Sequence, residues 1–195
     1  MKLRPPPQEA VFGLVLLVVL ALPTARQTLE SRMLTHMLVQ YPAAMLCGAL
    51  LAGVLRPAWR QRLRAWNCLG LSGLVFSALV LALLMIPRVL DLALQDGRIE
   101  AAKWLALLLC GAALRASWAD AGPVVQGFFL GNVLPMMAIV GWLYEASPLR
   151  VCNAYRIDDQ QDLGQMLMGL AAVIAAVWLG HAAWPHVKRP QAIRQ

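Results

Sequence analysis

Residues 163–184, LGQMLMGLAAVIAAVWLGHAAW, form an apolar run that is long enough to cross a bilayer as a helix. Such a crossing needs about 20 mostly apolar residues for about 30 Å of hydrocarbon. Similar runs lie near 10–25, 34–55, 67–87, 99–118 and 123–145. Of the 195 residues, 60% are hydrophobic and 14% are charged, too little polar surface for a soluble domain. The sequence therefore predicts an all-α, polytopic transmembrane helical bundle of about six spans, with residues 1–195 forming a single domain.

The positions of Lys and Arg predict the orientation of this bundle. With six spans and the N-terminus inside, ten of the 17 basic residues fall on the inner side: Lys2, Arg4, Arg56, Arg60, Arg62, Arg64, Arg115, Lys188, Arg189 and Arg194. The cluster between Arg56 and Arg64 is typical of a cytoplasmic loop that anchors on anionic lipid. We therefore expect a multi-pass protein of the bacterial inner (plasma) membrane with both termini in the cytoplasm.

The first apolar run has two interpretations. Lys2 and Arg4 followed by an apolar stretch that ends near Ala25 are also typical of a signal peptide. A small-x-small cleavage site is missing, because Pro23 occupies the outer small position. An uncleaved span and a cleaved leader both place Arg26 on the outer side, so the remaining topology is the same.

Composition and motifs argue against several classes of function. The net charge of +7 does not indicate a nucleic-acid partner, because the basic residues lie at the ends of apolar runs. The sequence contains no phosphate-binding loop, dinucleotide-binding glycine pattern, nucleophile elbow or zinc-protease helix motif. We therefore expect no enzymatic activity, and the lipid bilayer is the first partner that the sequence predicts.

Potential metal ligands form a stripe at the start of the second span. At 100° per residue, one helix face carries Met33, His36, Met37 and Gln40. Cys47 returns to within about 20° of His36 on the same face. Sulfur ligands with imidazole favour cuprous ion. However, methionine also fills gaps in apolar interfaces, and a histidine near the headgroups can be solvated. The stripe is therefore compatible with a metal-handling face and with ordinary packing.

A second polar stretch joins the last two spans. Asp158 or Asp159 is a good N-cap for the last helix, where acidic side chains complement the positive helix end. Asp162 and Met166 are four residues apart, so we expect them to face the bundle together just below the outer surface. Gly164 would allow a close approach of another helix.

These two stretches carry a resemblance to a known family. Asp159, Gln160 and Gly164, with Met166 or Met168, resemble the Asp-Gln, Gly and Met signature of a late span in the CtaG-like cytochrome c oxidase assembly proteins. The segment from Thr35 to Gln40 is similar to the early H-M-x-x-H segment of that family. In this chain Gln40 stands where the second histidine is expected. The family also tends to have a histidine-rich H-x-x-E-H-like stretch at the position of residues 98–103. In this chain only Glu100 corresponds to it.

The resemblance implies a membrane assembly factor that assists copper delivery to, or assembly of, a haem–copper cytochrome c oxidase. The implied cofactor is cuprous ion, and the candidate metal ligands are Met33, His36, Met37, Cys47, Asp162 and Met166. The implied partners are an oxidase subunit or a periplasmic copper donor. The missing histidines leave an alternative open, in which the chain is a non-metal accessory subunit or scaffold of a larger inner-membrane complex.

Overall fold

The computed structural model describes residues 8–55 and 57–187, and every element assigned within these ranges is helical. The elements are α1 (Gln8–Ala21), α2 (Pro23–Glu30), α3 (Met33–Thr35), the π-helix η1 (His36–Gln40), α4 (Tyr41–Leu51), η2 (Ala52–Val54), α5 (Pro57–Trp66), η3 (Cys68–Gly70), α6 (Leu71–Leu84), α7 (Pro87–Gln95), α8 (Gly97–Trp118), α9 (Pro123–Ala146) and α10 (Ile157–Val187). The predicted all-α bundle is confirmed.

Helix length and apolarity support three to five membrane spans among the described residues, whereas the sequence predicts about six. Within residues 8–55 and 57–187, three continuous helical segments are long and apolar enough to cross a membrane: Met33–Val54, Pro123–Ala146 and Ile157–Trp184. Two further spans are bent pairs, α1 with α2 at 71° and α6 with α7 at 75°, which brings the total to as many as five. The charged residues in α8 lower its apolarity, so the expected span near 99–118 remains a prediction.

Proline explains both bends. Pro23 and Pro87 begin α2 and α7, and the residues before them, Leu22 and Ile86, have extended backbone angles with ψ of 134° and 121°. Proline disfavours the helical conformation in the residue that precedes it, so each long helix ends there and a new one starts in another direction.

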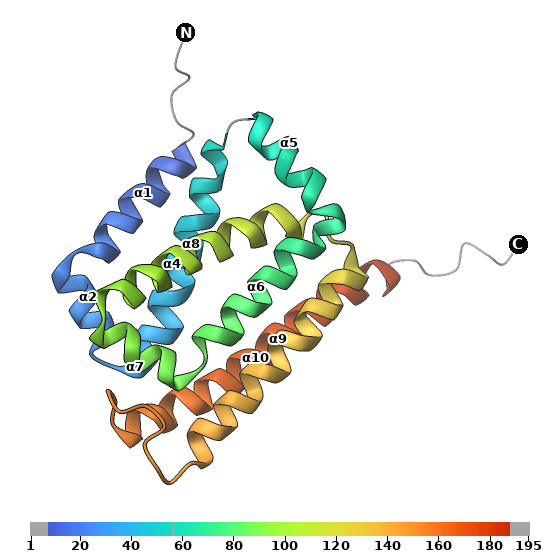
Figure 1. Ribbon diagram of the computed structural model, residues 1–195. Helices are drawn as coiled ribbons and strands as arrows, with labels where there is room; N and C mark the ends of the chain where they lie inside the picture. Colours follow the sequence, from blue (N-terminus) through green and yellow to red (C-terminus); the bar gives the residue numbers. More distant parts are fainter. Residues whose placement is uncertain (1–7, 56, 188–195) are drawn as a thin grey trace, which may run out of the picture.

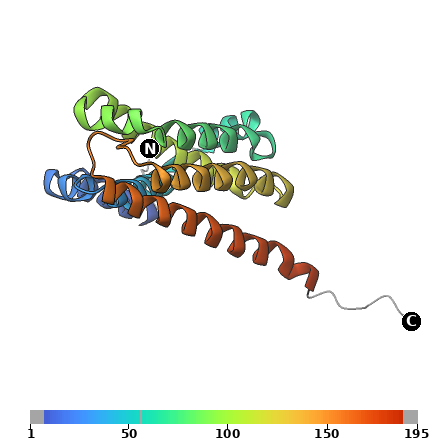
Figure 2. The same cartoon turned by 90° about the horizontal axis from the view of Figure 1, so that it is seen from below.

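The long helices run between two ends of the molecule (Figure 1). We call one the α5 end, where α5 and the turn between α8 and α9 lie, and the other the α7 end, where α2, α7 and residues 147–156 lie. Figure 2 shows α10 alongside α9, with which it forms an antiparallel hairpin. The chain's first seven residues and residues 188–195, on which the predicted cytoplasmic termini depend, lie outside the described ranges.

Polar side chains are buried in this bundle while large apolar side chains cover its surface. Lys103, Glu100 and Asp91 are buried, whereas Phe12 and Phe128 are 60% and 73% exposed. A soluble protein would gain nothing from this arrangement, but in lipid an apolar surface is the favoured one. The distribution of burial therefore supports a membrane environment.

The helices α4 and α8 cross at two glycines. A Cβ atom added to Gly48 would overlap the backbone of Leu108, and one added to Gly111 would overlap the backbone of Met45. The absence of side chains lets the two backbones touch, as small residues do in many membrane helix pairs. This contact holds the first turns of α8 beside η1, where the polar residues gather.

Candidate functional site: a buried polar network at the α7 end

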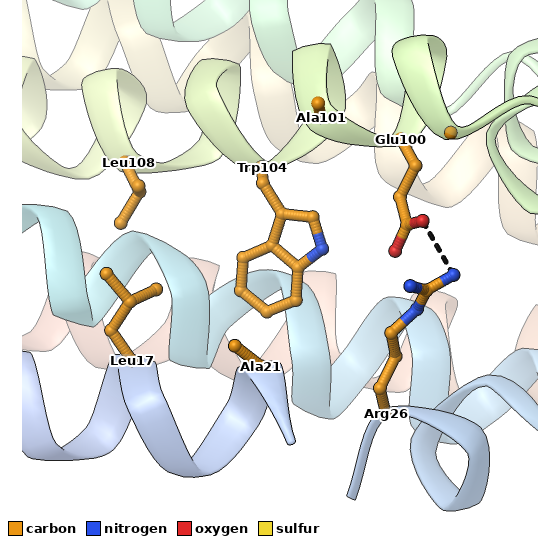
Figure 3. Close-up of a pocket in the computed structure, with 8 residues that line it drawn as sticks. Leu17, Ala21, Arg26, Glu100, Ala101, Trp104 and Leu108 are labelled. Carbon is orange, nitrogen blue, oxygen red and sulfur yellow. Dashed lines mark ion pairs between the residues drawn. The ribbon is translucent and has the colours of Figure 1, made fainter. Parts of the chain in front are cut away.

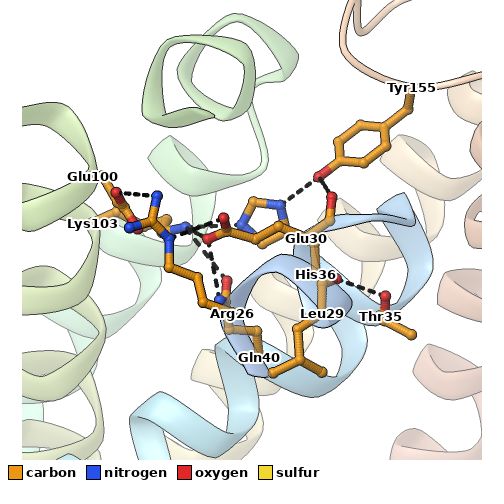
Figure 4. A network of polar contacts seen from close by, with 9 residues as sticks. All are labelled: Arg26, Leu29, Glu30, Thr35, His36, Gln40, Glu100, Lys103 and Tyr155. Carbon is orange, nitrogen blue, oxygen red and sulfur yellow. Dashed lines mark hydrogen bonds and ion pairs between the residues drawn. The ribbon is translucent and has the colours of Figure 1, made fainter. Parts of the chain in front are cut away.

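Lys103 lies at the centre of a polar network that connects α2, η1 and α8 (Figure 4). Its ammonium nitrogen Nζ donates to three acceptors: His36 Nε2 at 2.9 Å, Glu30 Oε1 at 3.3 Å and Gln40 Oε1 at 3.4 Å. The lysine is 2% exposed, and His36 and Gln40 are fully buried. Three acceptors match the three N–H bonds of an ammonium, so this buried cation is fully satisfied.

The network sets the tautomer of His36. The hydroxyl of Tyr155 donates to the backbone carbonyl of Glu30 at 3.0 Å, and its oxygen lies 2.7 Å from His36 Nδ1. Because Tyr155 has one proton to donate, Nδ1 must carry the proton of that second bond. The Nε2 atom is then unprotonated and accepts a hydrogen bond from the Lys103 ammonium. His36 is therefore a neutral imidazole whose two ring nitrogens are both engaged.

Opposite charges balance within the network. Arg26 donates through Nε to Glu30 Oε2 at 3.1 Å and pairs through its terminal NH2 group with Glu100 Oε2 at 2.6 Å. Gln40 Nε2 also donates to Glu30, at 3.2 Å. Two cations, Arg26 and Lys103, thus face two carboxylates. Charges removed from water are stable only when they are paired and hydrogen-bonded in this way.

The helix changes from α-helical to π-helical geometry at η1, whose side chains His36 and Gln40 contact Lys103 of α8. Residues 36–40 form a π-helix between α3 and α4. Pro42 has no backbone N–H and cannot bond the carbonyl of Leu38, which removes one α-helical hydrogen bond from this stretch. Single π-turns of this kind occur often at functional sites. Here both His36 and Gln40 contact the same lysine.

The segment of residues 147–156 covers the network from the α7 end and is fastened at two points. The carboxylate of Asp91 accepts from the backbone N–H groups of Asn153 at 2.9 Å and Ala154 at 3.1 Å. Gln160 accepts from the N–H of Val151 at 2.8 Å and donates to the carbonyl of Tyr144 at 3.0 Å. These bonds hold the segment, and with it Tyr155, in place over His36.

Ionisable groups in and beside this segment titrate far from neutral pH. Burial, with the Glu30 carboxylate nearby, raises the pKa of the Tyr155 hydroxyl, which therefore stays a hydrogen-bond donor. Burial next to Asp91 raises the pKa of the Cys152 thiol to about 12. The hydrogen bond and charge of Asp159 raise the pKa of Arg32 above its ordinary value.

The sequence-predicted residues fall into two groups. Met33, His36, Met37 and Cys47 are all buried. Asp162 is instead largely exposed and lies 3.3 Å from Arg32, and Met166 is 57% exposed. The expectation that Asp162 and Met166 face the bundle is therefore wrong. Their helix turns that face outward, because Leu163 and Leu167 fill the interface in their place.

The residues of the family-like signature have structural partners. Asp159 Oδ1 accepts from Arg32 Nε at 2.9 Å, and Gln160 holds the 147–156 segment. Gly164 faces Gly141, where an added Cβ would meet the backbone of α9. The helix α10 begins at Ile157, so Asp158 and Asp159 lie in its first turn, as expected of acidic residues there, but neither is its N-cap. The Asp158 carboxylate pairs with Arg156.

Sequence reasoning missed Arg26, Glu30, Lys103 and Tyr155 as members of the site. The available signal was Lys103 itself, a charged residue one turn inside an apolar helix, which is a functional suspect in a membrane. Its partners could not be named from the sequence, because Glu30 and His36 lie 73 and 67 residues away.

The described residues do not fit a cuprous ion on His36 in this arrangement. A metal on Nε2 would have to displace the Lys103 ammonium, and a metal on Nδ1 would have to displace Tyr155. A fixed ammonium at 2.9 Å would also repel an added cation.

Comparisons of the chain with family models, with curated proteins and with solved structures find no match.

Proposed function

We propose that this chain is an integral membrane assembly factor that resembles the CtaG-like proteins and assists the assembly of a haem–copper oxidase. In this proposal it lies in the bacterial inner membrane, with the α5 end in the cytoplasm and the α7 end outside. It acts by contact with an oxidase subunit and is not itself an enzyme.

One observation carries the proposal: the two segments on which the resemblance depends lie against each other. His36 of the early segment is 2.7 Å from Tyr155, just before the late segment, and Arg32 is 2.9 Å from Asp159. These contacts bring the two motifs, which are far apart in sequence, close together at the α7 end, where the proposed partner would bind.

The position of Lys103 beside His36 favours a role in oxidase assembly that involves no bound metal ion over the delivery of copper from His36. A protein that hands on cuprous ion needs an open nitrogen or sulfur position, whereas Lys103 and Tyr155 occupy the imidazole. This observation favours the non-metal alternative, in which the polar network holds the α7 end in the shape that a partner subunit recognises.

The proposal is tested by removing the gene from the source cells and restoring it with variants. Tyr155→Phe removes the hydroxyl that joins His36 to the backbone of Glu30 and leaves a buried N–H unpaired, at a cost of about 1–3 kcal/mol. We expect a severalfold loss of assembled oxidase, measured by haem difference spectra of the membranes. Tyr41→Phe is the matched control, because the Tyr41 hydroxyl has no hydrogen-bond partner among the described residues.

Normal oxidase in cells that lack the gene would refute the proposal. A separate experiment tests whether the chain binds copper, by adding cuprous ion to the purified protein under reducing conditions and measuring the metal that stays bound. We expect no copper that depends on His36. Stoichiometric copper that is lost in His36→Ala would overturn the non-metal form and restore copper delivery.

A further inference from the structure

A groove on the surface of the bundle lies beside the polar network and shares Arg26 and Glu100 with it. It lies between α1 and α2 on one side and α8 on the other, with a volume of about 420 Å³ (Figure 3). Both α1 and α8 pack on α4, which keeps them apart and leaves the groove open between them. It faces the surroundings of the bundle, so its occupant must come from the membrane.

The chemistry of the groove changes along its length. At the α7 end, Arg26 and Glu100 form an ion pair. Trp104 lies in the middle, and Leu17 and Leu108 face each other at the end of the groove away from Arg26 and Glu100 (Figure 3). From Glu100 to Leu108 the helix rises about 12 Å, slightly less than half the thickness of the hydrocarbon core. The groove is charged at one end and apolar at the other. In a bilayer that α8 crosses, the charged end lies at headgroup depth and the apolar end toward the centre, which is the polarity of one lipid leaflet.

We propose that this groove binds a phospholipid with an ethanolamine headgroup. The Arg26 guanidinium binds the phosphate, since arginine presents several N–H donors in a fixed plane that suits phosphate oxygens. The Glu100 carboxylate accepts from the primary ammonium of the headgroup. An acyl chain lies along Trp104 between Leu17 and Leu108.

The ion pair selects this headgroup over the other common ones. A positive and a negative side chain next to each other match a phosphate and an ammonium that are themselves neighbours. Glu100 would repel the added charge of cardiolipin, and the glycerol headgroup of phosphatidylglycerol offers it no cation. The quaternary ammonium of choline has no N–H to donate to the carboxylate.

The experiment reconstitutes the full chain in bilayers of equal parts ethanolamine, choline and glycerol phospholipids with identical acyl chains. The protein is then extracted in mild detergent, and the lipids that remain are counted by mass spectrometry. We expect about one ethanolamine lipid per chain, enriched severalfold over the two other lipids.

Two tryptophan variants locate the binding site. Ala101→Trp fills the groove and should abolish the enrichment. Ala102→Trp is the matched control: it adds the same side chain at the next exposed residue of α8, outside the groove lining, and should leave the enrichment unchanged. Arg26→Gln should weaken retention of the ethanolamine lipid even where the protein remains folded by size-exclusion chromatography.

The proposal fails if the three lipids are retained equally or if the glycerol lipid is preferred. It also fails if Ala101→Trp retains as much ethanolamine lipid as Ala102→Trp. Oxidase assembly is not part of the readout, so this result and the test of the proposed function are independent.

Discussion

Lys103 stabilises the polar network through charge as well as hydrogen bonds. Lys103→Met keeps the length of the side chain but leaves Glu30 facing Arg26 and Gln40 alone and leaves His36 Nε2 without a donor. Removing one partner of a buried ion pair typically costs about 3–5 kcal/mol. Because Glu30 keeps Arg26, we expect a loss near the lower limit, measured by unfolding of the purified protein in mixed detergent micelles.

A double-mutant cycle separates the charge from the loss of packing. In Glu30→Gln/Lys103→Met both charges are gone, so most of the loss in the single lysine variant should be recovered. If the two single losses simply add, the ion pair is not what stabilises this end of the bundle.

The cysteines differ in reactivity because they differ in burial. Cys152 is buried with its pKa raised to about 12, whereas Cys68 is exposed. The reactive species is the thiolate, whose fraction at pH 8 for a pKa of about 12 is on the order of 10⁻⁴. A maleimide at pH 8 should therefore modify Cys68 quickly and Cys152 only after unfolding, as read by peptide mass spectrometry. Rapid labelling of Cys152 in the folded protein would contradict the described position of the 147–156 segment.

At the scale of the helix, the glycine contact between α4 and α8 positions the site. Gly111→Ala would push a methyl group into the backbone of Met45 and force the two helices apart. Overpacking of this kind lowers the free energy of unfolding by about 1–3 kcal/mol or more. We therefore expect a clear drop in the midpoint temperature of thermal unfolding. Gly131→Ala in α9 is the control, because nothing lies within 4 Å of the added methyl group. Equal midpoints for the two variants would show that α4 and α8 do not touch at Gly111.

Sequence patterns predicted the elements better than the contacts between them. Apolar runs marked the position of each long helix, because burial in lipid requires such runs. In the sequence Pro23 interrupts the small-x-small pattern of a cleavage site, and in the structure it bends a helix pair. The outward position of Met166 depends on which face of α10 packs against α9, and the hydrophobic run is apolar on all sides. The pairing of Lys103 with Glu30 is long-range, and a single sequence contains no signal for it.

For the whole molecule, the sides of the membrane on which two positions lie show whether α8 spans it, because each crossing moves the chain to the other side. Between Arg62 in α5 and Asp159 in α10, the chain passes through the α6–α7 pair, α8 and α9. If all three cross, the two positions lie on opposite sides of the membrane, and if α8 does not cross, they lie on the same side. The charged residues of α8 do not prevent crossing, because Glu100 and Lys103 are paired with Arg26 and Glu30.

We therefore expect reporters at Arg62 and Asp159 to lie in opposite compartments, with Arg62 in the cytoplasm as the basic residues of α5 predict. Fusions to a phosphatase that is active only outside the cytoplasm, and to a fluorescent protein that folds only inside it, read the two positions in opposite ways. A fusion at Trp118, after α8, should report the same side as Arg62. If Arg62 and Asp159 instead report one compartment, α8 does not span the membrane, and the lipid groove along α8 would lose its assigned depth.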